Sequence, residues 1–265
     1  MPLNRSRALL AIFLTGVATT AGAATIEGPQ WVRIENGREI SINGRLYQSQ
    51  STDRHPVALL GWPDASTFQF NVFPGDEWED DHASSERAEL SGHPSPFAND
   101  AEMWISFAVL VEEGSASDGL DSYLGQLHQF AGSQDASAEP PFLLHLHGRQ
   151  LTVEGRTSPE NPLVSGDPKP LVFHKEQFPW GEWVNFVFHL KLDPAGDGLV
   201  EGWRNGKRIV DYAGPLGFAS TTGVYWKFGS YRNEVPTGYY GTRYANIEVG
   251  HDDLSARVES PIPVP

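Results

Sequence analysis

Apolar and polar residues alternate along several short segments of the chain, and a period of two is typical of β-strands with one face in a core. The alternation is clearest between residues 183 and 192. Apolar side chains there would face the core, opposite a polar set: Val184, Phe186, Phe188, Leu190 and Leu192 against Asn185, His189 and Lys191. We predict strands at residues 102–111, 122–130, 142–146, 183–192, 200–203, 207–212, 225–232 and 242–249.

Turn-forming residues separate these segments. The chain has 27 glycines and 20 prolines among 265 residues and no long stretch of helical periodicity. Asn205-Gly206 predicts a tight hairpin, because a type I′ turn requires positive φ at both positions. We therefore predict an all-β fold: a β-jelly roll, a concanavalin-like two-sheet sandwich with a concave substrate groove. A single domain would span residues 24–258, followed by a flexible tail at 259–265.

The first 23 residues have the pattern of a signal peptide. Arg5 and Arg7 form a basic start, residues 8–17 an apolar stretch, and Ala21-Gly22-Ala23 a small-residue cleavage site. The apolar stretch is too short to span a bilayer comfortably. We predict a secreted or periplasmic protein with no membrane association.

Composition narrows the ligand class. The net charge is −15 and there is no cysteine, so disulfides and thiolate metal sites are excluded. A protein this acidic is not a general nucleic-acid binder. If its ligand is anionic, basic groups must be concentrated in one place. We expect a monomer that binds no nucleic acid.

The segment at residues 225–232 places unusual side chains on one strand face. One face would carry Tyr225, Lys227, Gly229 and Tyr231, and the other Trp226, Phe228, Ser230 and Arg232. The first face suits a groove that binds a polyanion, with Lys227 favouring the ionised form of Tyr231. An aromatic strand with one solvent-directed lysine is the simpler alternative. It explains Gly229 less well, because glycine weakens a strand unless something such as a sugar approaches closely.

Two earlier segments add the other groups that such a groove would need. Gln126 and His128 share one strand face, and Arg87 and Glu89 share another. Taken separately, a solvated polar face and a structural Arg–Glu pair explain them. Together with Tyr231 they could cleave a uronate polymer by β-elimination. Arg87 and Gln126 would neutralise the carboxylate, and His128 and Tyr231 would serve as base and acid.

Three short motifs resemble those of jelly-roll alginate lyases, in the same order and with similar spacing. Residues 87–90 read Arg-Ala-Glu-Leu, like the Arg-x-Glu-Leu motif, and residues 126–128 read Gln-Leu-His, like Gln-x-His. Residues 225–231 read Tyr-Trp-Lys-Phe-Gly-Ser-Tyr, like Tyr-Phe-Lys-x-Gly-x-Tyr. The Tyr231-Arg232 ending and the hairpin at 203–207 are more similar to the heparin lyase I-like and glucuronan lyase group. The resemblance covers residues 84–250.

The resemblance implies roles for individual residues. Arg87 and Gln126 would neutralise the carboxylate, His128 would be a base or neutraliser, and Tyr231 an acid or both acid and base. The substrate-binding residues that we expect are Lys227, Glu89, Tyr225, Arg232, His82, His145 and His147. A further histidine from an upstream loop is expected, with His55 and His82 as candidates. No cofactor would be required, although the resemblance leaves room for a structural calcium ion.

Two other patterns favour simpler interpretations. His145 and His147 could form a metal pair, but the sequence offers no evident third ligand. We therefore expect them to line the groove or to lie on a solvated face, and we predict no metal site. The acidic residues at 76–81 lack the spacing of a calcium loop, so we expect a solvated loop.

The sequence thus predicts an exported polysaccharide lyase that cleaves a 4-linked uronic-acid-containing polysaccharide by β-elimination. Glucuronan-like and heparin-like polymers rank ahead of alginate. A non-catalytic carbohydrate-binding protein on the same fold is the first alternative, because jelly rolls have many functions. A glycoside hydrolase is the second. It would need a pair of strand carboxylates, and no Glu-x-Asp-x-x-Glu pattern is present.

Overall fold

The computed structural model describes residues 31–62, 65–78, 85–233 and 238–264. The predicted signal segment at residues 1–23 and the candidate His82 lie outside these residues. Among the residues described, no helix is long and apolar enough to cross a membrane.

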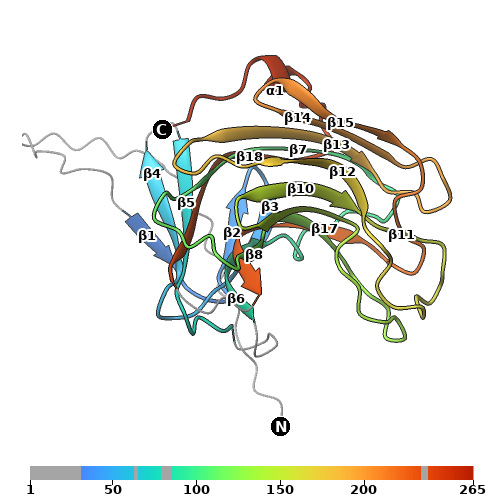
Figure 1. Ribbon diagram of the computed structural model, residues 1–265, viewed down its shortest axis with the longest axis horizontal. Coiled ribbons are helices and arrows are strands. Elements are labelled where there is room, and N and C mark those ends of the chain that lie inside the picture. The colour runs from blue at the N-terminus through green and yellow to red at the C-terminus, as the bar shows by residue number, and fades with distance from the viewer. Residues whose placement is uncertain (1–30, 63–64, 79–84, 234–237, 265) are drawn as a thin grey trace, which may run out of the picture.

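Two eight-stranded antiparallel sheets form the molecule (Figure 1). The first sheet contains, in spatial order, β1 (Trp31–Ile34), β4 (Val57–Trp62), β5 (Ala65–Val72), β18 (Tyr240–Gly250), β7 (Glu102–Val111), β13 (Val184–Lys191), β14 (Leu199–Arg204) and β15 (Lys207–Ala213). The second contains β12 (Leu171–Gln177), β10 (Gln150–Gly155), β9 (Phe142–His147), β8 (Asp121–Gln129), β17 (Val224–Asn233), β6 (Ser85–Ser91), β3 (Arg45–Gln50) and β2 (Glu39–Ile42). A parallel pair, β11 (Thr157–Ser158) and β16 (Gly217–Phe218), and a short helix, α1 (Ala256–Glu259), complete the fold.

The sheets are curved along their long strands. In Figure 1, β10 and β17 lie on the inner side of the curve and β13 and β14 on the outer side. The face of the second sheet that is turned away from the first is therefore concave, and we call it the concave face. The predicted all-β, two-sheet fold is confirmed.

All eight strands predicted from alternation are present, with ends within two residues of those expected. In β13, Val184, Phe186, Phe188 and Leu190 are fully buried, as the period of two requires. The β14–β15 hairpin turns at Asn205 and Gly206, whose φ angles are 47° and 78°. Positive φ at both positions confirms the predicted turn.

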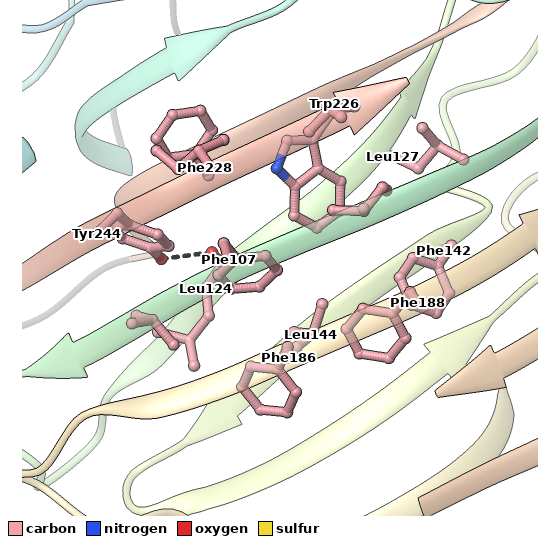
Figure 2. Packing of buried hydrophobic residues seen from close by; sticks show 14 of the residues in the cluster. Phe107, Leu124, Leu127, Phe142, Leu144, Phe186, Phe188, Trp226, Phe228 and Tyr244 are labelled. Carbon is pink, nitrogen blue, oxygen red and sulfur yellow. Dashed lines mark hydrogen bonds between the residues drawn. The ribbon is translucent and has the colours of Figure 1, made fainter. Parts of the chain in front are cut away.

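The core between the sheets is rich in aromatic rings (Figure 2). Phe107 of β7 packs 5.7 Å from Trp226 of β17, and Phe188 of β13 packs 5.2 Å from Phe142 of β9, measured between ring centroids. These contacts join the two sheets, because each pair has one member from each. They fix the core-facing residues of β17, so the alternate residues of that strand must project onto the concave face.

A bulge in β8 changes which residues face the groove side. Tyr123 pairs with His145 and Gly125 with Leu144, so Leu124 is an extra residue relative to β9. Leu124 is fully buried in the core, and a Cβ on Gly125 would lie 2.5 Å from the Trp226 ring. Two consecutive residues thus face the core, and residues before and after them face the concave side.

A core tyrosine holds this bulge from the other sheet. The hydroxyl of Tyr244, on β18, donates a hydrogen bond to the carbonyl oxygen of Leu124 (Figure 2) and shares its proton with the carbonyl oxygen of Gly229 on β17, 3.2 Å away. Backbone groups released at a bulge need such partners when they are buried. The first sheet therefore supports the irregular part of the second.

The C-terminal segment after α1 contacts the first sheet. Asn246 of β18 donates hydrogen bonds to the carbonyl oxygens of Ile262 and Pro263, at 2.9 and 3.1 Å. The residues that we expected to form a flexible tail are therefore anchored at these positions.

Candidate active site

The three segments singled out in the sequence lie side by side at the centre of the second sheet. β17 lies between β8 and β6. Lys227 pairs with Gln126 of β8, and Tyr231 pairs with Arg87 of β6. The strand pairing thus brings together the polar residues that alternation had assigned to one face of each strand.

Glu89 lies at the centre of this polar group and is only 1% exposed. It accepts a hydrogen bond from Nε2 of Gln126 at 3.0 Å. Its carboxylate also forms ion pairs with Nζ of Lys227 at 3.1 Å and with Nη1 of Arg87 at 3.4 Å. Arg87 donates a further hydrogen bond to Gln50 on the neighbouring β3 at 3.3 Å. We call Arg87, Glu89, Gln126 and Lys227 the Glu89 group.

The charges of the Glu89 group favour an anionic ligand. Burial alone would raise the pKa of Glu89, but Lys227, Arg87 and the amide of Gln126 lower it, so the carboxylate is ionised at neutral pH. With two cations and one carboxylate, the Glu89 group carries a net charge of +1, in a chain whose net charge is −15. We expected Glu89 to bind substrate. It is instead buried, and it positions Arg87, Gln126 and Lys227.

Tyr231 is held between a cation and another ring. The guanidinium carbon of Arg87 lies 4.5 Å from the centre of its ring, and Tyr123 stacks on it at 5.3 Å with an interplanar angle of 8°. Its hydroxyl donates a hydrogen bond to Oδ1 of Asn233 at 3.0 Å. These contacts fix the ring and leave the phenol beside the Glu89 group.

His128 lies at the other end of the group, next to Tyr225. Their rings stack at 5.3 Å, and the Tyr225 hydroxyl is 3.2 Å from Nδ1 of His128. The same nitrogen is 3.0 Å from the carbonyl oxygen of Gln129. A carbonyl only accepts, so this bond places a proton on Nδ1 and leaves the lone pair on Nε2. Burial, helped by the charge of Lys227, lowers the pKa of His128 to about 4.

The structure does not bring His128 and Tyr231 together as a base–acid pair. His128 pairs with Tyr225, six residues before Tyr231 on β17. At about 3.3 Å per residue, this corresponds to roughly 20 Å along the strand. The two residues lie on opposite sides of the Gln126–Lys227 pair.

His145 and His147 lie on β9, on the far side of β8 from the Glu89 group. His145 contacts Asp121 through Nε2 and Glu154 through Nδ1. Burial alone would lower the pKa of His145, but hydrogen bonds to Asp121 and Glu154 raise it to about 9. Asp121 also lies 3.5 Å from His147, so a carboxylate that the sequence did not reveal lies beside both histidines.

Two expectations about β17 are corrected. Arg232 is fully buried and cannot contact substrate there: it faces away from Tyr231, pairs with Glu86 at 2.6 Å and donates to the Gly238 carbonyl. Gly229 serves the backbone and not the sugar. Its φ is +141°, and an added Cβ would lie 2.5 Å from the carbonyl oxygen of Ala88.

His55 lies in the loop after β3 and contacts Asp76 at 2.8 Å. Asp76, expected in a solvated loop, is 1% exposed and accepts hydrogen bonds from the backbone N–H of Phe73 and from Thr52. Its carbonyl oxygen accepts from the backbone N–H of Arg87. Asp76 thus links His55 to Arg87 of the Glu89 group, and its many internal hydrogen bonds favour a structural role.

Sequence reasoning missed two residues next to the group. Strict alternation from Gln126 would turn Tyr123 into the core, and only the bulge brings it against Tyr231. His93 lies beyond the end of β6, with its ring 6.1 Å from that of Tyr225. Burial lowers the pKa of His93; Glu39 opposes this and Lys227 adds to it. No sequence motif includes His93, because its position beside Tyr225 depends on the conformation of the turn after β6.

Comparison with known proteins gives a consistent result. A family model described as polysaccharide lyase matches residues 22–251. No curated protein matches the chain significantly.

Solved structures share the fold. An endo-β-1,4-glucuronan lyase from the fungus Trichoderma reesei superposes with a TM-score of 0.57 and 12% identity, over 84% of this chain and 95% of that one. An alginate lyase from Pseudomonas aeruginosa gives 0.50 and 18%, over 78% and 98%. A family 7 alginate lyase in complex with substrate gives 0.53 and 13%, over 85% and 93%. At these identities the similarity establishes the fold.

Proposed function

The chain belongs to the polysaccharide lyase family, and from this premise we propose that it cleaves a 4-linked, uronic-acid-containing polysaccharide by β-elimination. The Glu89 group is the observation that carries the proposal. It concentrates positive charge and amide donors on the concave face of an acidic protein. An anionic polymer is the ligand that such a charge distribution selects.

The reaction begins at the uronate carboxylate. Arg87, Lys227 and Gln126 neutralise it, so that negative charge can spread onto its oxygens when the proton on C5 is removed. The electron pair of the C5–H bond then forms the C4–C5 double bond, and the bond from C4 to the glycosidic oxygen breaks. The departing oxygen takes a proton. The products are one fragment with a new reducing end and a second fragment whose non-reducing end is an unsaturated uronate.

We assign both proton transfers to Tyr231. Its ring lies beside Arg87, whose charge stabilises negative charge on the phenol oxygen. His128 is separated from it along the strand and its pKa of about 4 makes it a weak base. A single group acts on one face of the sugar. This suits uronates in which the C5 proton and O4 share a face, as in glucuronate and mannuronate, and supports glucuronan-like polymers as first candidates.

His128 and Gln126 would then contact the sugar or its carboxylate from the other side. The neutral imidazole can form a hydrogen bond without adding charge. The mechanism requires no cofactor. Export is part of the proposal, supported by the basic, apolar and small-residue pattern of residues 1–23.

The first experiment incubates the protein with glucuronan, a heparin-like polymer, polymannuronate and polyguluronate, and follows ultraviolet absorbance of the unsaturated product. A rise with glucuronan or polymannuronate, and little with polyguluronate, is expected. Reducing ends without that absorbance would indicate a hydrolase, and binding without cleavage a carbohydrate-binding protein. Either outcome would overturn the proposal.

A pair of variants tests the assignment of the proton transfers. Tyr231→Phe should lower kcat by at least about 10²-fold with binding largely retained, because only the phenol oxygen is lost. His128→Ala should lower it less. His55→Ala should leave it near the unmodified value. If His128→Ala is as inactive as Tyr231→Phe while both remain folded, the single-tyrosine mechanism is wrong.

A further inference from the structure

Three side chains with metal-ligating atoms converge at one end of β8 and β9. One ligand atom from each of Asp121, His145 and His147 lies within 4.8 Å of the other two, and Oδ1 of Asp121 contacts Nε2 of His145 and Nδ1 of His147. Within the ranges that the structure describes, no other group of three or more His, Asp or Glu side chains meets this condition. The pairing of Asp121 with His147 across the two strands creates the cluster, since His145 and His147 already share a face.

The spacing fits a small tetrahedral ion. Zinc–nitrogen and zinc–oxygen bonds of about 2.0–2.2 Å place neighbouring ligand atoms roughly 3.3–3.5 Å apart. Oδ1 of Asp121 and Nδ1 of His147 are 3.5 Å apart. The His145–Asp121 contact is shorter and would widen as the ion replaces the proton between them.

Two further residues orient the ligands in the way that metal sites require. Glu154 lies 3.4 Å from Nδ1 of His145, on the side of the ring opposite Asp121. A ligating histidine almost always donates its other N–H to a carboxylate or carbonyl. Asn233 forms a hydrogen bond with Asp121. The side chains of His145 and Asp121 are therefore held in position before any ion binds.

The cluster is also accessible. The side chains of Asp121 and His147 are 39% and 54% exposed, so an ion could enter from solvent and keep a water molecule or ligand oxygen in its fourth position. Two imidazoles favour a transition-metal ion over calcium or magnesium, which prefer oxygen ligands.

We propose that Asp121, His145 and His147 bind a divalent transition-metal ion of the zinc class, with Glu154 and Asn233 orienting the ligands. The site is separate from the Glu89 group and goes beyond the proposed lyase chemistry, which uses no metal. It replaces our expectation that the two histidines only line the groove.

Binding of the metal alone provides the test. The full chain is treated with chelator, dialysed, and titrated with Zn²⁺ by calorimetry and with Co²⁺ by visible absorption, where tetrahedral coordination gives intense bands. One equivalent should bind. His147→Ala should weaken binding at least about 10-fold, and Glu154→Gln about 10- to 100-fold. His147 is exposed, so its replacement should leave thermal unfolding of the metal-free protein unchanged.

His189→Ala is the matched control. His189 also lies between two carboxylates, Glu102 and Glu201, at 2.6 and 2.9 Å, but belongs to the first sheet. Its replacement should leave the stoichiometry and affinity unchanged. The proposal is overturned if no equivalent of Zn²⁺ binds, or if the folded His147→Ala protein binds it as tightly as the unmodified chain.

Discussion

Replacing Glu89 with glutamine removes the negative charge from the centre of the Glu89 group while keeping the size of the side chain. The carboxylate accepts from Gln126, Lys227 and Arg87 at 3.0, 3.1 and 3.4 Å. The amide oxygen of a glutamine could accept from one of them. Its NH₂ group would then face donors, and Lys227 and Arg87 would lose the anion that pairs with them.

The expected cost follows from burial. The side chains of Glu89, Lys227 and Arg87 are 1%, 5% and 10% exposed, so water cannot replace the lost pairing. Removing one partner of a buried ion pair lowers the free energy of unfolding by about 3–5 kcal/mol. At about 2–4 °C per kcal/mol for a domain of this size, Tm should fall by about 6–20 °C.

The effect should depend on pH with a defined sign. The pKa of Glu89 is lowered in the folded protein. Its contribution to stability is therefore present above the ordinary carboxyl pKa of about 4.3 and is lost as pH falls through the lower, folded value. Urea unfolding near pH 7 and at about pH 3.5 should show the difference between Glu89→Gln and the unmodified protein shrinking in acid.

Glu201→Gln is the control for this prediction. Glu201 pairs with His189 at 2.9 Å and Arg208 at 2.6 Å, but it is 27% exposed on the first sheet. Its replacement should cost less than about 1 kcal/mol. If Glu89→Gln costs no more than Glu201→Gln near pH 7, buried charge pairing does not hold the group together and the reasoning fails.

Two further predictions concern the residues around the group. Tyr244→Phe removes the hydroxyl that contacts the carbonyl oxygens of Leu124 and Gly229. Urea unfolding should therefore show that the free energy of unfolding falls by about 1–3 kcal/mol, and turnover should be lower. Unchanged stability would show that the bulge needs no support. His128 has a pKa of about 4 and is uncharged above it, so His128→Asn should leave the shape of the pH profile of kcat/KM unchanged between about pH 5 and 9. A change in kcat/KM near pH 6.5 that occurs in the unmodified protein and is absent from the variant would contradict this.

Local patterns were sufficient for the regular part of the site. Alternation assigned Lys227 and Tyr231 to one face of β17, and Gln126 and Arg87 to faces of β8 and β6. The contacts of Lys227, Gln126 and Arg87 with Glu89, and of Tyr231 with Arg87, confirm this. These assignments succeed because the period of two is a property of the strand itself.

What depends on contacts between distant segments could not be predicted in the same way. The bulge at Leu124 is supported by Tyr244, 120 positions away, so nothing near Tyr123 shows that its side chain leaves the core. The register between β8 and β9 likewise brings Asp121 to His147. Arg232 was misplaced for another reason: a motif ending was given more weight than the alternation, which already put it opposite Tyr231.

The extra residue in β8 also shifts the alternation of side chains, so the two halves of the strand follow different odd–even patterns. Before Leu124, odd-numbered residues such as Asp121 and Tyr123 face the concave side; after Gly125, even-numbered residues such as Gln126 do. Deletion of the extra residue would restore strict alternation and leave both halves facing as they do now, with Tyr123 and Gln126 on the concave side. Sequence alignments of relatives should therefore permit a single-residue gap here. Protein engineers could likewise redesign the half that carries Asp121 and Tyr123 without moving Gln126.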